Sequence, residues 1–332
     1  MDFNYKDICK SFVKGLPQRT TDVIERRFGL KTGQRETLEA IGQSYNITRE
    51  RVRQIEKEGF SKIRPKIKEY KNVFQFLNKT LECFGGIKEE NALLKFLGKG
   101  KFQNYAFFLL FLAGDFKRFP EDDNFNSLWA VKKEAVSQAK KIVRATIKRF
   151  EKENKVLFLP ELLKGQKLNR EVFLSCLEIS KQIQKNPEDK FGLRDWIEIN
   201  PRSVKDKAYL VLKKQEKPLH FSEIANFIEK LPFPSKGETH VATVHNELIK
   251  DQRFVLVGRG LYALKEWGYE PGIVKDIIYK TLKEAKKSLS KNEILNKVLG
   301  QRFVKANTVV LNLQDKNYFE KDEKGRYTIR EA

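Results

Sequence analysis

The chain has few residues that could form a metal site or a disulfide framework. Its 332 residues include three cysteines and three histidines. The cysteines lie far apart without metal-ligand spacing, so we expect buried or partly buried thiols in a reducing cytosol. They are Cys9, Cys83 and Cys176. His220, His240 and His245 have no cysteine or carboxylate companions at ligand spacing. We therefore expect no metal and no cofactor.

The chain also lacks the motifs of enzymes that act on nucleotides and nucleic acids. The segment Gly98–Lys101 is too short for a phosphate-binding GxxxxGK[ST] loop. A two-metal nuclease needs clustered carboxylates with a lysine. The acidic stretches Glu121–Asp123 and Glu320–Glu323 fall instead in expected hairpins and loops. We therefore expect a protein that is not an enzyme.

No apolar run has the length of a membrane span. The most apolar run, Tyr105–Gly114, is far short of the ~20 residues that a spanning helix needs, and we interpret it as a buried helix. The first ten residues, MDFNYKDICK, lack the positive-then-apolar pattern of an export signal. We expect a soluble, cytoplasmic, nucleoid-associated protein without a membrane partner.

Basic residues outnumber acidic residues by 66 to 44, which gives a formal net charge of +22. Such a charge favours a polyanionic partner, and nucleic acid is the usual one. General basicity of a proteome would explain the abundance of lysine, but not an ordered DNA-binding motif. The length indicates two or more domains.

The sequence between residues 37 and 64, TLEAIGQSYNITRERVRQIEKEGFSKIR, predicts two short helices joined by a tight turn. Thr37 suits an N-cap, and Leu38 and Ile41 give a first helix its apolar stripe. Gly42 is small where a second helix must cross closely. The turn is Tyr45–Ile47, in which Asn46 can adopt the left-handed conformation.

The second helix follows Thr48, its expected cap. Its buried face is Val52, Ile55, Gly59 and Ile63. The opposite face carries Arg49, Glu50, Arg53 and Gln54. Arginine can pair with guanine, glutamine with adenine and glutamate with the cytosine amino group, so this face suits base readout in the major groove. A surface helix with ion pairs among Glu50, Arg53, Gln54 and Lys57 remains the alternative.

Residues 16–64 resemble region four of bacterial primary sigma factors, through LPQRTTDVIERRFGL and the highly specific run TRERVRQIE. The resemblance implies recognition of the promoter −35 element and a seat on the flap of the RNA polymerase core. It also implies base reading by Arg49, Glu50, Arg53 and Gln54. The expected contacts to the DNA backbone are Arg26, Arg27, Thr37, Thr48, Arg51, Lys57, Lys62 and Arg64.

The resemblance covers only the first ~65 residues, the size of a small module. The aromatic-rich helices with which sigma factors melt the −10 element have no counterpart here. We therefore expect a sequence-specific, sigma-like transcription factor that works with RNA polymerase but does not replace a complete sigma factor. The alternative is a polymerase-bound scaffold or accessory subunit with little base readout.

The remaining chain repeats helices followed by a short hairpin. We expect a mainly α protein, in which a helix-turn-helix precedes tandem winged helix-turn-helix domains with short β-hairpin wings. The expected segments are 1–70, 71–132, 133–201, 202–270 and 271–332. Three hairpins end near a tryptophan, expected to anchor the core, and Tyr327 takes this place in the fourth. The tryptophans are Trp129, Trp196 and Trp267.

The segment 203–269 resembles the HARE-type winged helix, through KPLHFSEIANFI and RFVLVGRGLYALKEW. That family includes the N-terminal domain of the RNA polymerase delta subunit and modules of chromatin and restriction proteins. The resemblance implies polymerase association or DNA binding. We expect helices at Lys207–Lys213, Phe221–Ile228 and Val241–Lys250. His220 is expected to cap the second of these or to pack against it, whereas Arg259, at the wing tip, is either a DNA contact or a solvated turn residue.

The other segments give helix and hairpin predictions of the same kind. A basic helix at Lys133–Glu153 either lines a nucleic-acid groove or presents a solvated face. Asn169–Gln184 is expected to be a recognition-like helix. The remaining predicted helices are Val73–Cys83, Glu89–Leu97, Phe102–Ala113, Gly272–Ala285, Lys291–Leu299 and Lys305–Leu313, with hairpins at Lys117–Val131 and around Glu323–Gly325.

Overall fold

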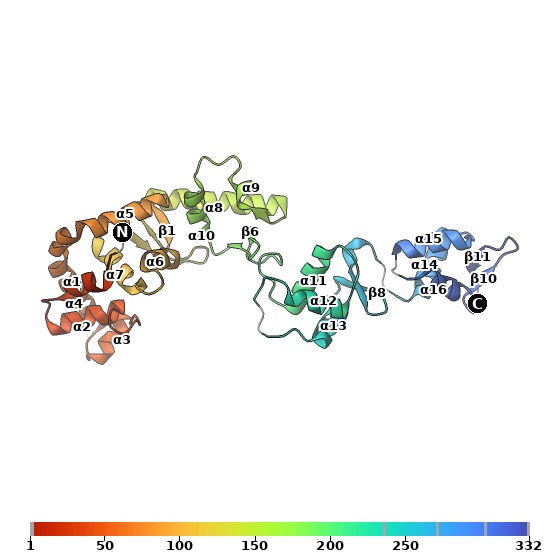
Figure 1. Ribbon diagram of the computed structural model, residues 1–332, viewed down its shortest axis with the longest axis horizontal. Coiled ribbons are helices and arrows are strands. Elements are labelled where there is room, and N and C mark those ends of the chain that lie inside the picture. Colours follow the sequence, from red (N-terminus) through yellow and green to blue (C-terminus); the bar gives the residue numbers. More distant parts are fainter. Residues whose placement is uncertain (1–2, 235–236, 270–271, 302–303, 331–332) are drawn as a thin grey trace. The chain divides into compact units, whose positions relative to one another are not determined.

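A computed structural model describes residues 3–234, 237–269, 272–301 and 304–330. Helices dominate, and the strands form small antiparallel sheets of two or three strands (Figure 1). The predicted fold class, mainly α with hairpin wings, is confirmed. The chain divides into two compact units, which are described separately. One is Met1–Lys185 with Asp189–Arg194, and the other is Asn186–Glu188 with Asp195–Ala332.

The first unit begins with a helix-turn-helix module. The side chain of Thr37 accepts a hydrogen bond from the backbone N–H of Ala40, and that of Thr48 accepts one from Arg51. Both predicted caps are therefore confirmed, and they fix where the two helices of the motif begin. The elements are α1 (Tyr5–Val13), α2 (Gln18–Phe28), α3 (Leu38–Ser44), α4 (Arg49–Ile63) and the 3₁₀ helix η1 (Arg64–Tyr70).

The turn between α3 and α4 has the predicted geometry. Asn46 has φ 53°, in the left-handed region. Gly42 lies so close to the turn that a Cβ atom there would be 2.7 Å from the carbonyl oxygen of Ile47. Ile41 and Val52 are fully buried in the small core between the two helices. The turn thus holds α4 at a fixed angle to α3.

A winged helix follows in the same unit. Its sheet has the order β1-β3-β2, because the first strand pairs with the last. The predicted helices and the wing were correct, but strand β1 was not predicted. The elements are α5 (Lys71–Cys83), β1 (Ile87–Glu89), α6 (Glu90–Gly98), α7 (Gln103–Ala113), β2 (Lys117–Phe119) and β3 (Leu128–Ala130).

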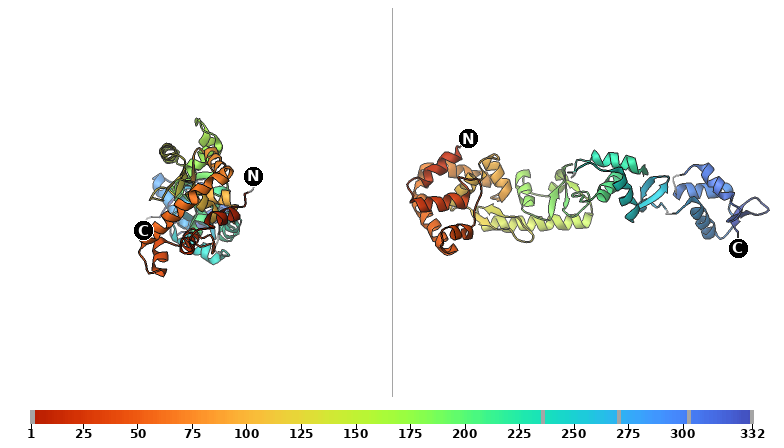
Figure 2. Two further views of the ribbon diagram at one scale, coloured as in Figure 1. Left: turned by 90° about the vertical axis from the view of Figure 1, so that its left-hand side faces the viewer. Right: turned by 90° about the horizontal axis from the view of Figure 1, so that it is seen from below.

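The second winged helix has the same topology, with sheet order β4-β6-β5. The predicted basic helix is confirmed at its predicted bounds, and Figure 2 shows it as one unbroken helix. The elements are α8 (Lys133–Glu153), β4 (Leu157–Phe158), α9 (Leu159–Leu163), α10 (Arg170–Glu178), β5 (Ile183–Lys185) and β6 (Lys190–Leu193).

The predicted helix Asn169–Gln184 was wrong at its C-terminal end. Helix α10 ends at Glu178, and residues 183–185 form a strand instead. The backbone leaves the helix because it pairs with the preceding winged helix: the N–H of Lys181 donates to the carbonyl of Asn124 at 2.9 Å. A distant segment therefore ends this helix.

The second compact unit contains two more helix-and-hairpin segments. The predicted helices are confirmed, although α11 begins three residues early because Ser203 and Asp206 form a capping box. The third segment has α11 (Val204–Gln215), β7 (Leu219–His220), α12 (Phe221–Glu229), α13 (Val241–Lys250), β8 (Phe254–Gly258), β9 (Leu261–Leu264) and the 3₁₀ helix η2 (Lys265–Trp267). The fourth has α14 (Val274–Ala285), α15 (Lys291–Gln301), α16 (Ala306–Leu313), β10 (Phe319–Lys321) and β11 (Tyr327–Ile329).

A short repeat marks the start of the second helix in three of the four segments. It has the pattern xKxLxxxE, at Asn154–Glu161, Glu216–Glu223 and Lys286–Glu293. Its first residue is left-handed in each case, its leucine is buried, and its glutamate accepts the backbone N–H of the N-cap residue. The repeat produces a turn, a short strand or single bridge, and a capped helix. It was not recognised in the sequence.

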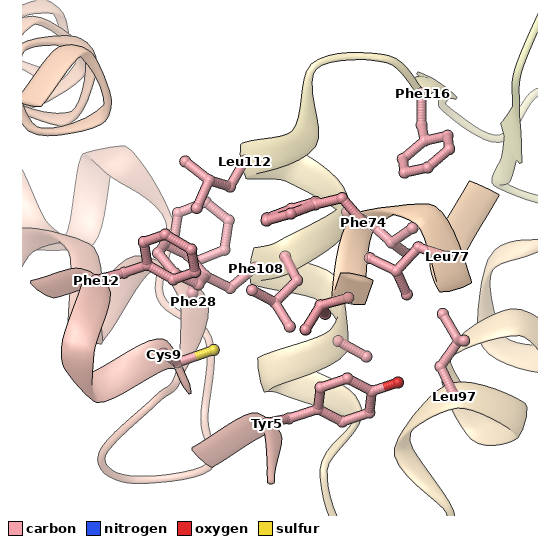
Figure 3. Close-up of a cluster of buried hydrophobic side chains, with 14 of the residues drawn as sticks. Tyr5, Cys9, Phe12, Phe28, Phe74, Leu77, Leu97, Phe108, Leu112 and Phe116 are labelled. Carbon is pink, nitrogen blue, oxygen red and sulfur yellow. The ribbon is translucent and has the colours of Figure 1, made fainter. Parts of the chain in front are cut away.

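The large core of the first unit joins the helix-turn-helix module to the first winged helix. Figure 3 shows Phe12 and Phe28 of the module close to Phe108 and Leu112 of α7. This explains why the apolar run Tyr105–Gly114 is a buried helix, as predicted. Across the residues that the structure describes, no helix is both long and apolar enough to span a membrane. The bounds of the five predicted domains stay predictions.

The tryptophans and cysteines divide between core and surface. Trp129 is buried in the large core as predicted, whereas Trp267 packs on the third segment's core and Trp196 is half-buried. Cys9 and Cys176 are buried, and burial raises the pKa of the Cys176 thiol to about 11. The prediction was wrong for Cys83, which is exposed because it ends α5 on the helix's solvent side.

Candidate nucleic-acid interface

The first two turns of α4 present a polar face to solvent. Arg49, Glu50, Arg53 and Gln54 are all exposed there, as predicted. The side chains of Arg53 and Glu50 are 55% and 59% exposed. The opposite face of α4 is buried against α2 and α3, so the helix can turn only its polar side toward a ligand.

Two intrahelical pairs organise this face. The guanidinium of Arg53 donates to both carboxylate oxygens of Glu50, at 2.6 and 2.9 Å. Arg51 donates to Oε1 of Gln54 at 2.9 Å. The hydrogen bond from Arg53 holds the pKa of Glu50 below its usual range. The structure therefore contains the Glu50–Arg53 ion pair that is expected if α4 is only a surface helix. Both side chains of this pair are nevertheless exposed to solvent.

Arg26 and Arg27, expected at the DNA backbone, have partners inside the protein. Arg26 grips both carboxylate oxygens of Glu36, at 2.7 and 2.9 Å, and also donates to the Ser44 hydroxyl. Arg27 donates to the Glu36 carbonyl and lies 3.7 Å from the Glu56 carboxylate. These contacts clamp α2 to both ends of α3. A DNA contact by either arginine stays a prediction.

The other expected backbone contacts are of two kinds. The hydroxyls of Thr37 and Thr48 cap α3 and α4, so they lie at helix N-termini, where backbone N–H groups favour phosphate. The four remaining cations are exposed along α4 and its C-terminal end. They are Arg51, Lys57, Lys62 and Arg64.

Sequence reasoning missed the acidic residue that holds this framework. Glu36 directly precedes the Thr37 cap, and its hydrogen bonds with Arg26 lower the pKa of its carboxyl. Tyr45 was assigned only to the turn. Its hydroxyl also donates to Asp22 at 2.7 Å, and the Arg19 guanidinium lies over its ring at 5.0 Å. The position of Glu36, directly before the Thr37 N-cap, could have indicated its role from the sequence.

In the third segment, His220 is the N-cap of α12, as predicted, with Nδ1 2.6 Å from the Ser222 hydroxyl. Arg259 is exposed at the tip of the hairpin between β8 and β9. Within the described parts of the chain, no group of histidine, cysteine and acidic side chains could hold a metal ion. The candidate interface consists of the exposed face of α4 and the exposed cations along the same helix and at its C-terminal end.

Two segments of this chain match families of known helix-turn-helix domains. Residues 13–65 match "Sigma-70, region 4". Residues 202–267 match the HARE-HTH family, a helix-turn-helix domain whose description names ASXL and restriction endonuclease proteins. Both predicted resemblances are confirmed. The chain thus carries two segments that match helix-turn-helix families, one of them named for sigma factors.

Curated relatives that match this chain over short stretches include bacterial sigma factors. RNA polymerase sigma factor SigA of Nostoc sp. is 51% identical over 59 residues, which are 18% of this chain and 15% of the relative. RNA polymerase sigma factor SigA1 of Synechococcus elongatus is 51% identical over 49 residues, which are 15% of this chain and 12% of that relative. The chain therefore spans only a small part of the sigma factors that it resembles.

Proposed function

We propose that the chain is a sequence-specific DNA-binding transcription factor of sigma-like type, which reads a −35-like promoter element and associates with RNA polymerase. One observation carries the proposal. A capped, rigidly supported helix presents an exposed row of two arginines, a glutamate and a glutamine in its first two turns. This is the set of side chains that distinguishes base pairs in the major groove.

Each side chain then has its own role. Arg49 and Arg53 donate to guanine, Gln54 pairs with adenine, and Glu50 accepts from cytosine while it orients Arg53. Arg51, Lys57, Lys62 and Arg64 contact phosphates, and the caps of α3 and α4 approach the backbone as well.

A selection from random duplexes tests base reading directly. The wild-type chain should yield one motif. Arg53→Ala should weaken binding to that motif by roughly 1–3 kcal/mol and relax preference at one base pair. Lys57→Gln is the matched control, because loss of a phosphate contact should weaken all sequences alike. A wild-type selection without any consensus would refute the proposal.

A second candidate function is a polymerase-bound scaffold, and the third helices of the later segments favour it. Helix α16, ANTVVLNL, has no charged residue, and Leu311 on it is 67% exposed. Helix α13 likewise exposes Ile249 at 62%. Apolar exposed faces suit protein contacts better than phosphate contacts. If the triple variant Arg49→Ala, Arg53→Ala, Gln54→Ala keeps both polymerase capture and biological function, the scaffold is supported.

We further infer a cytoplasmic, nucleoid-associated protein without enzymatic activity, because both matched segments belong to families of helix-turn-helix domains. Purified protein incubated with plasmid and magnesium should leave the DNA intact. Cleavage that survives repurification and tracks with the protein peak would contradict this inference.

A further inference from the structure

Helix α8 has two faces of opposite character. Its buried face packs on α10 and on strands of both winged helices, and consists of Val136, Ala139, Val143, Thr146 and Phe150. The residues halfway around the helix from this face are exposed. A 21-residue helix with one buried side offers the other side as a long, straight surface.

Four cations form a row on that exposed side. They are Lys141, Arg144, Lys148 and Lys152, spaced three, four and four residues apart. At a rise of 1.5 Å per residue the row is about 16 Å long. We call it the α8 row. The helix residues that fall between these four on the same face are uncharged, apart from Glu151 at its edge.

The α8 row differs from neighbouring cations, which have partners. Lys140 pairs with Asp122, and Arg149 pairs with Glu153 and donates to the Glu161 carbonyl. In the contacts of the described residues, by contrast, no ion pair or side-chain hydrogen bond involves the α8 row. Like charges four residues apart repel each other along a helix. The row therefore lowers helix stability unless a polyanion neutralises it.

We propose that the α8 row is a second, sequence-independent contact of this protein with duplex DNA, along the phosphate backbone. The inference rests on the proposed function, because it assigns to α8 the same ligand that α4 reads. Duplex DNA carries one negative charge per ≈ 1.7 Å of its axis, so the whole row can face phosphates. The row has no carboxylate acceptor or amide at its centre, so it can bind without reading bases.

The sequence-reading helix and the α8 row are joined through one core. Phe60 of α4 contacts Phe111 of α7, and Phe111 contacts Trp129 of β3, with ring centroids 5.8 and 6.4 Å apart. Helix α8 begins three residues after β3 ends. Because α4 and α8 belong to the same compact unit, binding of DNA by one makes the second contact an intramolecular event. The second contact therefore strengthens binding without the entropic cost of a second association.

The test is the salt dependence of binding by the full chain. A variant with Lys141, Arg144, Lys148 and Lys152 all changed to Gln keeps helix propensity. For a random-sequence duplex, the slope of log K against log salt should become shallower by up to about 3.6, since each neutralised phosphate contributes ≈ 0.9. The preference for the selected motif over random duplex should not change.

Two control variants separate this contact from charge and folding effects. Changing Lys283, Lys287, Lys291 and Lys297 to Gln removes the same charge from exposed positions of the fourth segment. An equal loss of slope in that control overturns the proposal, because net charge alone then explains the effect. A variant with Arg in place of Lys141, Lys148 and Lys152 keeps the charge of the row, and its salt slope should equal that of the wild type. A slope as shallow as that of the Gln variant would also overturn the proposal.

The outcomes also separate this inference from the proposed function. An unchanged slope in the Gln variant, with motif preference still lost in Arg53→Ala, overturns the α8 contact and leaves the function standing. A shallower slope without any selected motif supports the α8 contact and refutes base reading. If the Gln variant loses binding to single-stranded RNA and keeps its affinity for duplex DNA, the proposal fails.

Discussion

Phe28 of α2 packs edge-on against Phe108 of α7, with ring centroids 5.2 Å apart. This contact joins the helix-turn-helix module to the winged helix that follows it. The same α7 fixes the loop before α3, because the Tyr105 hydroxyl donates to the Leu30 carbonyl and the Asn104 amide donates to the carbonyl of Gly33. The position of the helix-turn-helix module therefore depends on residues far along the chain.

Replacing Phe108 with Ala should destabilise the module and the first winged helix together. The ring is fully buried, and loss of a buried phenylalanine costs about 3–5 kcal/mol. Denaturant unfolding followed by fluorescence measures the loss. Phe96→Ala is the control, because Phe96 is 57% exposed and its removal should cost less than about 0.5 kcal/mol. A variant in which DNA binding resists denaturant as in wild type would show that the module does not depend on α7.

Replacing Gly42 with Ala should distort the turn of the helix-turn-helix. The new Cβ atom would meet the backbone carbonyl of Ile47, which cannot move without the turn. We expect a loss of about 1–3 kcal/mol in stability and a larger loss in DNA affinity. Thermal unfolding and duplex titration measure the two effects.

Gly300 provides the matched control for that substitution. It lies in α15, and a Cβ atom there has nothing within 4 Å. Gly300→Ala should therefore raise helix stability by about 0.5–1 kcal/mol and leave DNA binding unchanged. Equal behaviour of the two alanine variants would show that the contact at Gly42 is unimportant.

The parts of the fold that the sequence predicted are those set by neighbouring residues. The caps at Thr37 and Thr48, the left-handed Asn46 and the apolar faces of α3 and α4 all arise within one or two turns. The exposure of Arg49, Glu50, Arg53 and Gln54 follows from the same helical period. For this reason most helix bounds and the polar face of α4 could be derived.

The parts that the sequence did not predict depend on distant partners. Helix α10 ends early because Lys181 pairs with Asn124, 57 residues away in the chain. Strands such as β4 and β7 have two residues each, too few for an alternating pattern, and exist because the last strand of their sheet lies beside them. The engagement of Arg26 by Glu36 and Ser44 likewise joins separate elements.

If the exposed face of α4 reads DNA as proposed, Glu50 should increase its preference for one sequence over others. Its carboxylate repels phosphates, and at a DNA interface it can accept hydrogen bonds from Arg53 or from a donor on a base. Glu50→Gln should therefore tighten binding to random duplex, steepen the salt slope by about 1, and reduce motif preference by about 1–3 kcal/mol. Competition titrations with motif and random duplexes measure both quantities. Glu69→Gln, which removes an exposed carboxylate outside this face, should leave motif preference unchanged.

Glu56 should make the stability of the module depend on pH. Its carboxyl lies on the buried side of α4, and burial raises its pKa above the usual range although Arg27 and Arg53 act in the opposite direction. In the interval between the ordinary and the raised pKa, the folded state binds more protons than the unfolded state. The free energy of unfolding then falls as pH rises through this interval.

Glu56→Gln mimics the protonated form at every pH. The variant should be more stable than wild type at pH 7, and the difference should shrink to nothing as pH falls below the ordinary pKa of a glutamate, about 4.3. Denaturant unfolding at a series of pH values from about 3.5 to about 8 measures the difference. Glu58→Gln is the control, because Glu58 is exposed on the same helix and its replacement should give a difference nearly independent of pH. A Glu56→Gln variant that is less stable than wild type at neutral pH would mean that the ion pair with Arg27 outweighs the cost of burial.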